Sequence, residues 1–218
     1  MNKLIVDKEL DISDYEGNIS FALSENVLNI KGKCRLYDFN NINNITINLL
    51  DNSSLEYYKI RSELSDSKLL VNQSNDTYLD YKEVIINNND FTYEINTILN
   101  GNNNVSKVTL RCLNESGSAK IFANGRVEEN TSNNELLEDL RGLNLNDNTL
   151  VIKPDMQINS LDVIANHKVT ISNVKDDELF YLESKGVNRK DAIKLLKEGF
   201  ILGILPLEMQ EKIKEYIK

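Results

Sequence analysis

Short runs of alternating apolar and polar residues fill the chain from about residue 17 to residue 172. Examples are NISFAL, ITINLL, LEYYKI, FTYEINTIL and VSKVTLRCL. A period of two residues is typical of β-strands, because successive side chains point to opposite faces. Clusters such as NNINN, DNSS and NGNNN separate the runs, and Asn, Asp, Ser and Gly are common turn residues. The pattern predicts an all-β body over residues 1–174.

This alternation is compatible with a β-sandwich, a barrel or a solenoid. The only prolines are Pro154 and Pro206, so no proline removes a backbone donor from the strands of the first 150 residues. The stacked coils of a solenoid need such continuous ladders, and Asn side chains can hydrogen-bond along them. A sandwich can show the same scarcity of proline, and no strict repeat is visible. The pattern alone therefore leaves the architecture open.

The period changes after residue 175. The segment DDELFYLESKG begins with acidic residues and ends at Gly186, as expected for a short helix. In NRKDAIKLLKEGF, Asn188 is a predicted N-cap with Asp191 three residues later. LEMQEKIKEYIK follows the break at Pro206 and predicts a third helix. Residues 175–218 are therefore predicted to form a C-terminal helical subdomain.

Composition narrows the classes of function. The chain has 218 residues and a net charge of −9, with no basic cluster of the kind that binds nucleic acid. Its longest apolar stretch, GFILGILPL, is shorter than a membrane span, and no signal peptide is visible. Cys34 and Cys112 have no disulfide or zinc spacing. We expect a cytoplasmic protein that binds neither nucleic acid nor a membrane, and the absence of nucleotide and hydrolase motifs predicts that it is not an enzyme.

The segment KPDMQINSLDVIANHKVTISNVKDDELFYLESKGVNRKDAIKLLKEGF resembles the C-terminal core of the SufB/SufD family, scaffold subunits of the SUF iron–sulfur cluster assembly system. Upstream, NSSLEYYKI and SGSAKIFANGRVEENTSNNELLEDLRGLNLNDNT are similar more weakly. The resemblance implies a right-handed parallel β-helix followed by helices that dock a SufC-like ABC ATPase. It also implies a transient iron–sulfur cluster, and a dimer formed with a SufB-like partner or by self-association.

His167 matches the histidine of the SufD pattern, a residue implicated in holding the nascent cluster together with a cysteine of SufB. Lys168 stands where SufB has a glutamate, and no cysteine lies between Leu113 and Asn166. The resemblance is therefore to SufD at this motif, and the SufB set of cluster-building residues is absent.

The single histidine and the cysteines each have two interpretations. His167 is a candidate metal and cluster ligand, since neutral imidazole binds iron. Alternation places it with Val169 and Ile171, so it could instead be a partly buried core residue. Cys112 is a candidate thiolate ligand or sulfur acceptor, and Cys34 has basic neighbours that would lower its pKa if it were exposed. Free cysteine is also a common core residue.

The apolar residues of the helical tail have two expected uses. Some of them are expected to cap the open end of the β body, and others to contact the ATPase partner. The candidate partner-binding residues are Leu179, Phe180, Leu182, Leu195, Leu196, Phe200, Ile204 and Leu207. An alternative function is a shortened β-solenoid module that binds the ATPase or itself without a cluster. A carbohydrate-active β-helix would instead require a groove lined with carboxylates.

Overall fold

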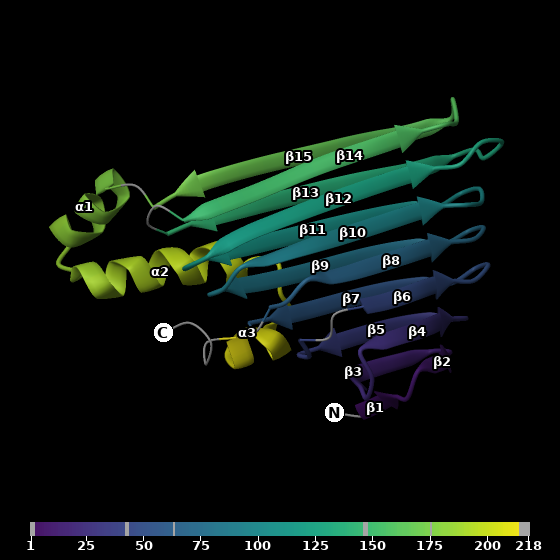
Figure 1. The fold of residues 1–218 in the computed structure, drawn as a ribbon, viewed down its shortest axis with the longest axis horizontal. Coiled ribbons are helices and arrows are strands. Elements are labelled where there is room, and N and C mark those ends of the chain that lie inside the picture. The colour runs from purple at the N-terminus through teal and green to yellow at the C-terminus, as the bar shows by residue number, and fades with distance from the viewer. Residues whose placement is uncertain (1–2, 42–43, 63, 146–147, 175, 214–218) are drawn as a thin grey trace.

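Two parallel β-sheets face each other and form a β-solenoid, as the resemblance implied (Figure 1). The structure is a computed structural model that describes residues 3–41, 44–62, 64–145, 148–174 and 176–213. Sheet A contains β1 Lys3–Val6, β3 Tyr15–Phe21, β5 Lys33–Asp38, β7 Ser54–Arg61, β9 Tyr78–Asn87, β11 Val105–Asn114, β13 Asn134–Asn144 and β15 Val163–Asn173. Sheet B contains β2 Glu9–Ile12, β4 Glu25–Ile30, β6 Asn44–Leu49, β8 Ser67–Gln73, β10 Phe91–Leu99, β12 Ser118–Val127 and β14 Thr149–Ile158.

Odd-numbered and even-numbered strands alternate between the sheets, so each coil of the solenoid stacks on the one before it. The separation in sequence between stacked residues grows along the chain. The parallel register pairs Cys34 with Leu55 in an early coil and Val105 with Glu135 in a later one, and a longer stretch of chain separates the second pair. This drift in coil length explains why the sequence shows no strict repeat.

Asparagine supports the coils in two ways. Several turn residues have left-handed backbone, including Asn52, Asn103 and Asn133 with φ of 61°, 58° and 54°. Buried Asn side chains also form a ladder, in which Nδ2 of Asn114 donates to Oδ1 of Asn144 at 2.8 Å. The interpretation of the Asn-rich segments as turns and ladders is confirmed.

Three helices follow the last strand: α1 Asp176–Ser184, α2 Arg189–Leu202 and α3 Leu207–Ile213. Gly186 has a φ of 88° just beyond α1, a conformation that glycine adopts without strain. Asn188 caps α2 by accepting a hydrogen bond from the Asp191 N–H at 3.0 Å. The predicted third helix reaches Ile213, and its residues 214–218 lie outside the described part of the chain. No helix in the described ranges is long and apolar enough to cross a membrane.

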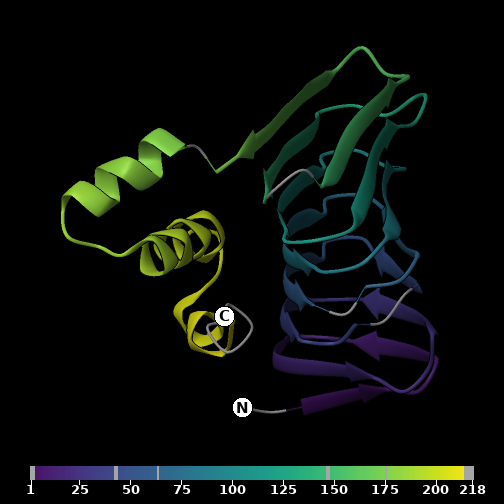
Figure 2. The ribbon, with the colours of Figure 1, turned by 60° about the vertical axis from the view of Figure 1, so that its left-hand side comes forward.

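Helices α2 and α3 pack along the outer face of sheet A, beside the solenoid (Figure 2). The buried side chains of Ile201, Leu205, Met209 and Ile213 lie against the outward-facing apolar residues Tyr37, Tyr58, Ile60, Val84, Ile86, Leu113 and Leu143. Lys197 also forms an ion pair with Glu115, across 2.5 Å. The tail therefore leaves the open end at β14 and β15 uncovered, and the expectation that it caps this end is wrong. The apolar strip on sheet A offers the helices more surface to bury.

Candidate functional site at the open end of the solenoid

The solenoid ends in an open coil formed by β14 and β15. Each of these strands pairs on one side only among the described residues, β14 with β12 and β15 with β13. Apolar side chains are exposed on this coil, with Ile164 67% and Ile171 43% exposed. An unpaired strand edge combined with exposed apolar residues is characteristic of a surface that binds another chain.

His167 lies in the middle of β15, with its side chain on the lumen side of the strand. Its register partner is Glu138 on β13, and two residues later Val169 pairs with Leu140, a core residue. The predicted face, which His167 shares with Val169 and Ile171, is confirmed. His167 is nevertheless exposed, because no further coil of the described chain covers β15, and its side chain has no hydrogen-bond partner among the described residues. Its imidazole nitrogens are therefore free to bind a ligand.

Glu138 lies one coil below His167 and is only 4% exposed. Its Oε2 atom is buried without a hydrogen-bond partner in the described part of the chain. Burial raises the pKa of Glu138 to about 7, and the negative charge of Asp155 adds to the rise. Sequence reasoning missed this residue, although the alternation of β13 places Glu138 between Leu136 and Leu140 on the buried face.

Both cysteines are buried, and the structure does not bring either one to His167. Cys112 is fully buried in the lumen, where burial and the nearby Glu83 carboxylate raise the pKa of its thiol. It pairs with Gly142, which pairs with Ile171, so Cys112 lies two coils below β15 and is also displaced from His167 along the strand direction. This separation is roughly 16 Å at normal strand spacing. Cys112 and His167 of one chain therefore cannot bind the same metal ion.

The candidate partner-binding residues of the tail differ in exposure. Leu179 is buried, whereas Phe180, Leu195 and Leu207 are 73%, 49% and 77% exposed. The remaining candidates are half-buried: Leu182, Leu196, Phe200 and Ile204. Of these, Phe200 and Ile204 contact the hydrophobic cluster between the helices and sheet A. Phe180 projects from α1, which extends away from the sheets in Figure 2.

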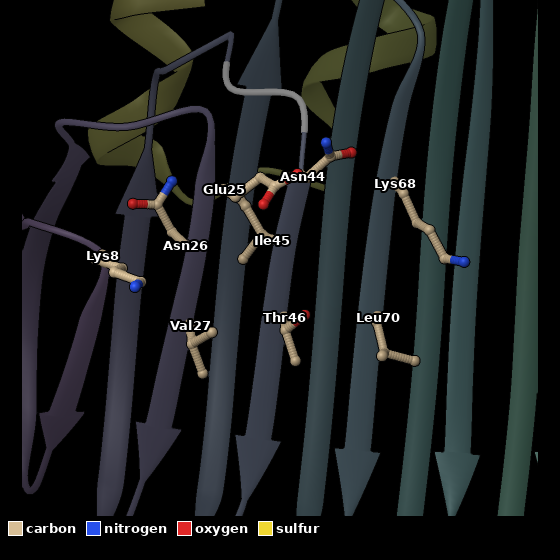
Figure 3. A pocket seen from close by; sticks show the side chains of 9 residues that line it. All are labelled: Lys8, Glu25, Asn26, Val27, Asn44, Ile45, Thr46, Lys68 and Leu70. Atoms are coloured by element: carbon tan, nitrogen blue, oxygen red, sulfur yellow. The ribbon is translucent and has the colours of Figure 1, made fainter.

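Two further grooves lie on the outer faces of the sheets, among the described residues. The groove in Figure 3, about 420 Å³ in volume, crosses the outer face of sheet B and is lined by Lys8, Glu25 and Lys68 among other residues. A second groove, on sheet A, contains Glu16 and Glu56, but Arg35 binds both carboxylates. The hydrogen bonds from Arg35 lower the pKa of Glu56 and hold this carboxylate in its ionised form.

A buried polar network inside the lumen was also missed. The ion pair between Arg61 and Glu83 has an N–O distance of 2.6 Å, and Tyr81 donates a second hydrogen bond to Glu83 at 2.6 Å. Arg61 also lies over the ring of Tyr93, 4.0 Å from its centroid. In LEYYKIR, Arg61 lies an even number of residues after the buried Leu55. The alternation could therefore have predicted that its side chain points inward. Because the charges of Arg61 and Glu83 are paired and both side chains are sealed from solvent, we assign them a structural role.

Comparison with known proteins identifies the family. Residues 38–200 match the family model described as SUF system FeS cluster assembly, SufBD core domain. The chain belongs to the SufBD family. An iron-sulfur cluster assembly SufBD family protein of Archaeoglobus fulgidus is 26% identical over 56% of this chain and 33% of its own length. The matches to the Synechocystis family member and to Escherichia coli SufD have 39% and 29% identity, each over 30% of this chain and 15% of the relative.

The chain therefore spans a third or less of the length of these curated relatives. Within the described residues, no three His, Cys, Asp or Glu side chains gather as a metal site. Among the described residues of the open end, His167 and Glu138 are register neighbours, and Asp155 on β14 is a further carboxylate whose charge acts on Glu138.

Proposed function

We propose that this chain is a non-enzymatic scaffold for iron–sulfur cluster assembly in the cytoplasm, and that it handles the cluster as transient cargo at the open end of its solenoid. The observation that carries the proposal is the match of residues 38–200 to the SufBD core, combined with an exposed His167 that has no hydrogen-bond partner in the described structure. Imidazole is a ligand for iron, and His167 matches the SufD histidine at this position.

The open coil is the surface we assign to the second subunit. The free edges of β14 and β15 present backbone N–H and C=O groups that the strands of another chain can pair with. The exposed Ile164 and Ile171 add apolar area to be buried on association. The partner is a SufB-like chain, which would contribute a thiolate, or a second copy of this chain.

The helical tail is the surface we assign to a SufC-like ABC ATPase. Phe180 on α1, Leu195 on α2 and Leu207 on α3 are exposed apolar residues that contribute little to the packing against sheet A. Because α2 and α3 are anchored on sheet A by a continuous hydrophobic cluster, movement of a bound ATPase would be transmitted to the solenoid.

Co-purification tests the ATPase assignment. The full chain is co-expressed with the SufC-like ATPase of its own genome, and Phe180→Asp and Leu207→Asp are each expected to weaken the association at least about tenfold. Leu161→Asp is the matched control, since Leu161 is fully exposed on the turn before β15 and remote from the tail. Equal recovery of the ATPase with all three variants would refute the assignment.

A second candidate function is a β-solenoid module that binds the ATPase or itself without a cluster. The sealed cysteines and the lack of three gathered ligands among the described residues favour it. Anaerobic reconstitution with iron and sulfide separates the two functions. A scaffold, alone or in complex, gains a cluster absorption that His167→Ala removes, whereas the binding module takes up no iron in either state.

A further inference from the structure

The buried carboxylate beneath His167 is the feature of this molecule that the assigned surfaces leave unexplained. Glu138 is 4% exposed, and no described Arg or Lys forms an ion pair with it. A buried acid without a charged partner or a full set of hydrogen bonds is costly. Such a group therefore calls for a specific explanation, and a bound cation is one.

The carboxylate of Glu138 lies beside a glycine of the facing sheet, next to the side chain of Leu136. A Cβ atom built at Gly125, on the facing strand β12, would lie 3.2 Å from Glu138 Oε1, so the carboxylate reaches across the lumen to the space beside this glycine. Thr97 pairs with Gly125 from the coil below, and its Oγ1 is also buried without a partner in the described structure. Two oxygens without a partner among the described residues are therefore buried in neighbouring coils of this part of the lumen.

His167 completes the arrangement from above. The parallel register puts its Cα opposite that of Glu138, so the two side chains project in the same direction from adjacent strands, whose spacing is about 4.8 Å. No described strand lies beyond β15, so solvent reaches the imidazole and has only one coil to pass to reach the carboxylate. A cation that enters at the open end would meet the imidazole first.

We infer that Glu138 and His167 together bind one divalent first-row cation, Fe²⁺ in the cell, at the mouth of the lumen. The choice of iron rests on the proposed function, whereas the site itself rests on the geometry. One nitrogen and one carboxylate oxygen suit a single divalent ion, while preformed clusters are held mainly by thiolates. The remaining coordination positions are left to water or to the second subunit across the open coil.

Loss of the Glu138 proton accompanies binding, because the cation competes with it for the carboxylate. The raised pKa of Glu138 means that this proton is still bound in part of the molecules near neutral pH. Binding measured at pH 8 avoids most of this competition. The experiment below therefore uses that pH.

The test is anaerobic titration of the purified, chelator-treated full chain at pH 8 with Fe²⁺ alone, followed by calorimetry, and with Co²⁺, followed by its visible absorption. Saturable binding by the wild type is expected. His167→Ala and Glu138→Gln should each weaken it at least about tenfold. Glu135→Gln is the matched control, because it removes a carboxylate from the outward face of the same strand, and it should bind as the wild type does.

Two results would overturn the inference. Binding that His167→Ala removes but Glu138→Gln leaves unchanged means that a surface imidazole alone holds the ion, and no binding by a folded wild type means that there is no site. Glu138→Asp, which keeps the charge and withdraws the carboxylate by one methylene, replaces Glu138→Gln if the latter does not fold. If the cation does not bind but the ATPase still associates, the inference is refuted and the proposed function is not. If the cation binds but the ATPase does not associate, the ATPase assignment is refuted and the inference is not.

Discussion

Replacing Glu138 by Gln should change how the stability of the metal-free protein depends on pH. The folded state raises the pKa of this carboxyl from 4.5 to about 7. Between these two values the folded protein keeps a proton that the unfolded chain has released. The free energy of unfolding therefore falls as the pH rises through this window. Below pH 4.5 both states are protonated and Glu138 imposes no such cost.

The magnitude follows from the size of the pKa change. Each pKa unit corresponds to about 1.4 kcal/mol, so the full cost above pH 7 is about 3 kcal/mol. At pH 5.5 only about 1.4 kcal/mol of it is present, which leaves about 2 kcal/mol to be lost between pH 5.5 and pH 8.5. A buried Gln can leave its own polar atoms unpaired, at a cost of about 1–3 kcal/mol that does not depend on pH. The difference between the two pH values is therefore the diagnostic quantity.

Urea unfolding at pH 5.5 and pH 8.5, with a chelator present, measures that difference. The free energy of unfolding of Glu138→Gln, taken relative to that of the wild type, should increase by about 2 kcal/mol from pH 5.5 to pH 8.5. Glu135→Gln, on the outward face of β13, should run parallel to the wild type. If the Glu138→Gln and wild-type profiles are also parallel, Glu138 does not titrate in this window and the reasoning fails.

Three further predictions concern the packing. Ile201→Ala empties a fully buried position between α2 and sheet A, so urea unfolding should show a loss of about 2–5 kcal/mol; an unchanged midpoint would mean that the helices contribute little. Glu83→Gln leaves the buried Arg61 without its counter-charge and should cost about 3–5 kcal/mol in the same assay, whereas a neutral effect would contradict a sealed ion pair. Cys34 and Cys112 should not react with a thiol reagent until urea unfolds the chain, and rapid labelling of the native protein would show that the lumen opens.

The elements were largely predictable because they depend on local pattern. Alternation in runs such as VSKVTLRCL corresponds to β11, and the turn residue Asn103 has the left-handed backbone that its position requires. Asn188 marked the start of α2 through its side-chain hydrogen bond. The choice of a solenoid came from the family resemblance, because a sandwich and a solenoid alternate in the same way along each strand.

The candidate site was only half predictable, because it depends on which coil lies above which. His167 and Glu138 are far apart in the sequence and adjacent in space, and the sequence offset between stacked residues is not constant, being shorter at Cys34 than at Val105. No fixed period therefore connects the two positions in the sequence. The helices were placed wrongly for a related reason. Outward-facing residues such as Val84 form an apolar strip only once the strands are stacked.

The open end of the fold combines several features that are costly for an isolated chain. The last coil exposes Ile164 and the free edges of two strands, and one coil below it Glu138 is buried without a counter-charge among the described residues. Elsewhere in the lumen the buried charges are paired, as between Lys59 and Asp38 at 2.8 Å. This contrast supports the proposal that the open end is a binding surface, because a cation and a second subunit would satisfy these groups together.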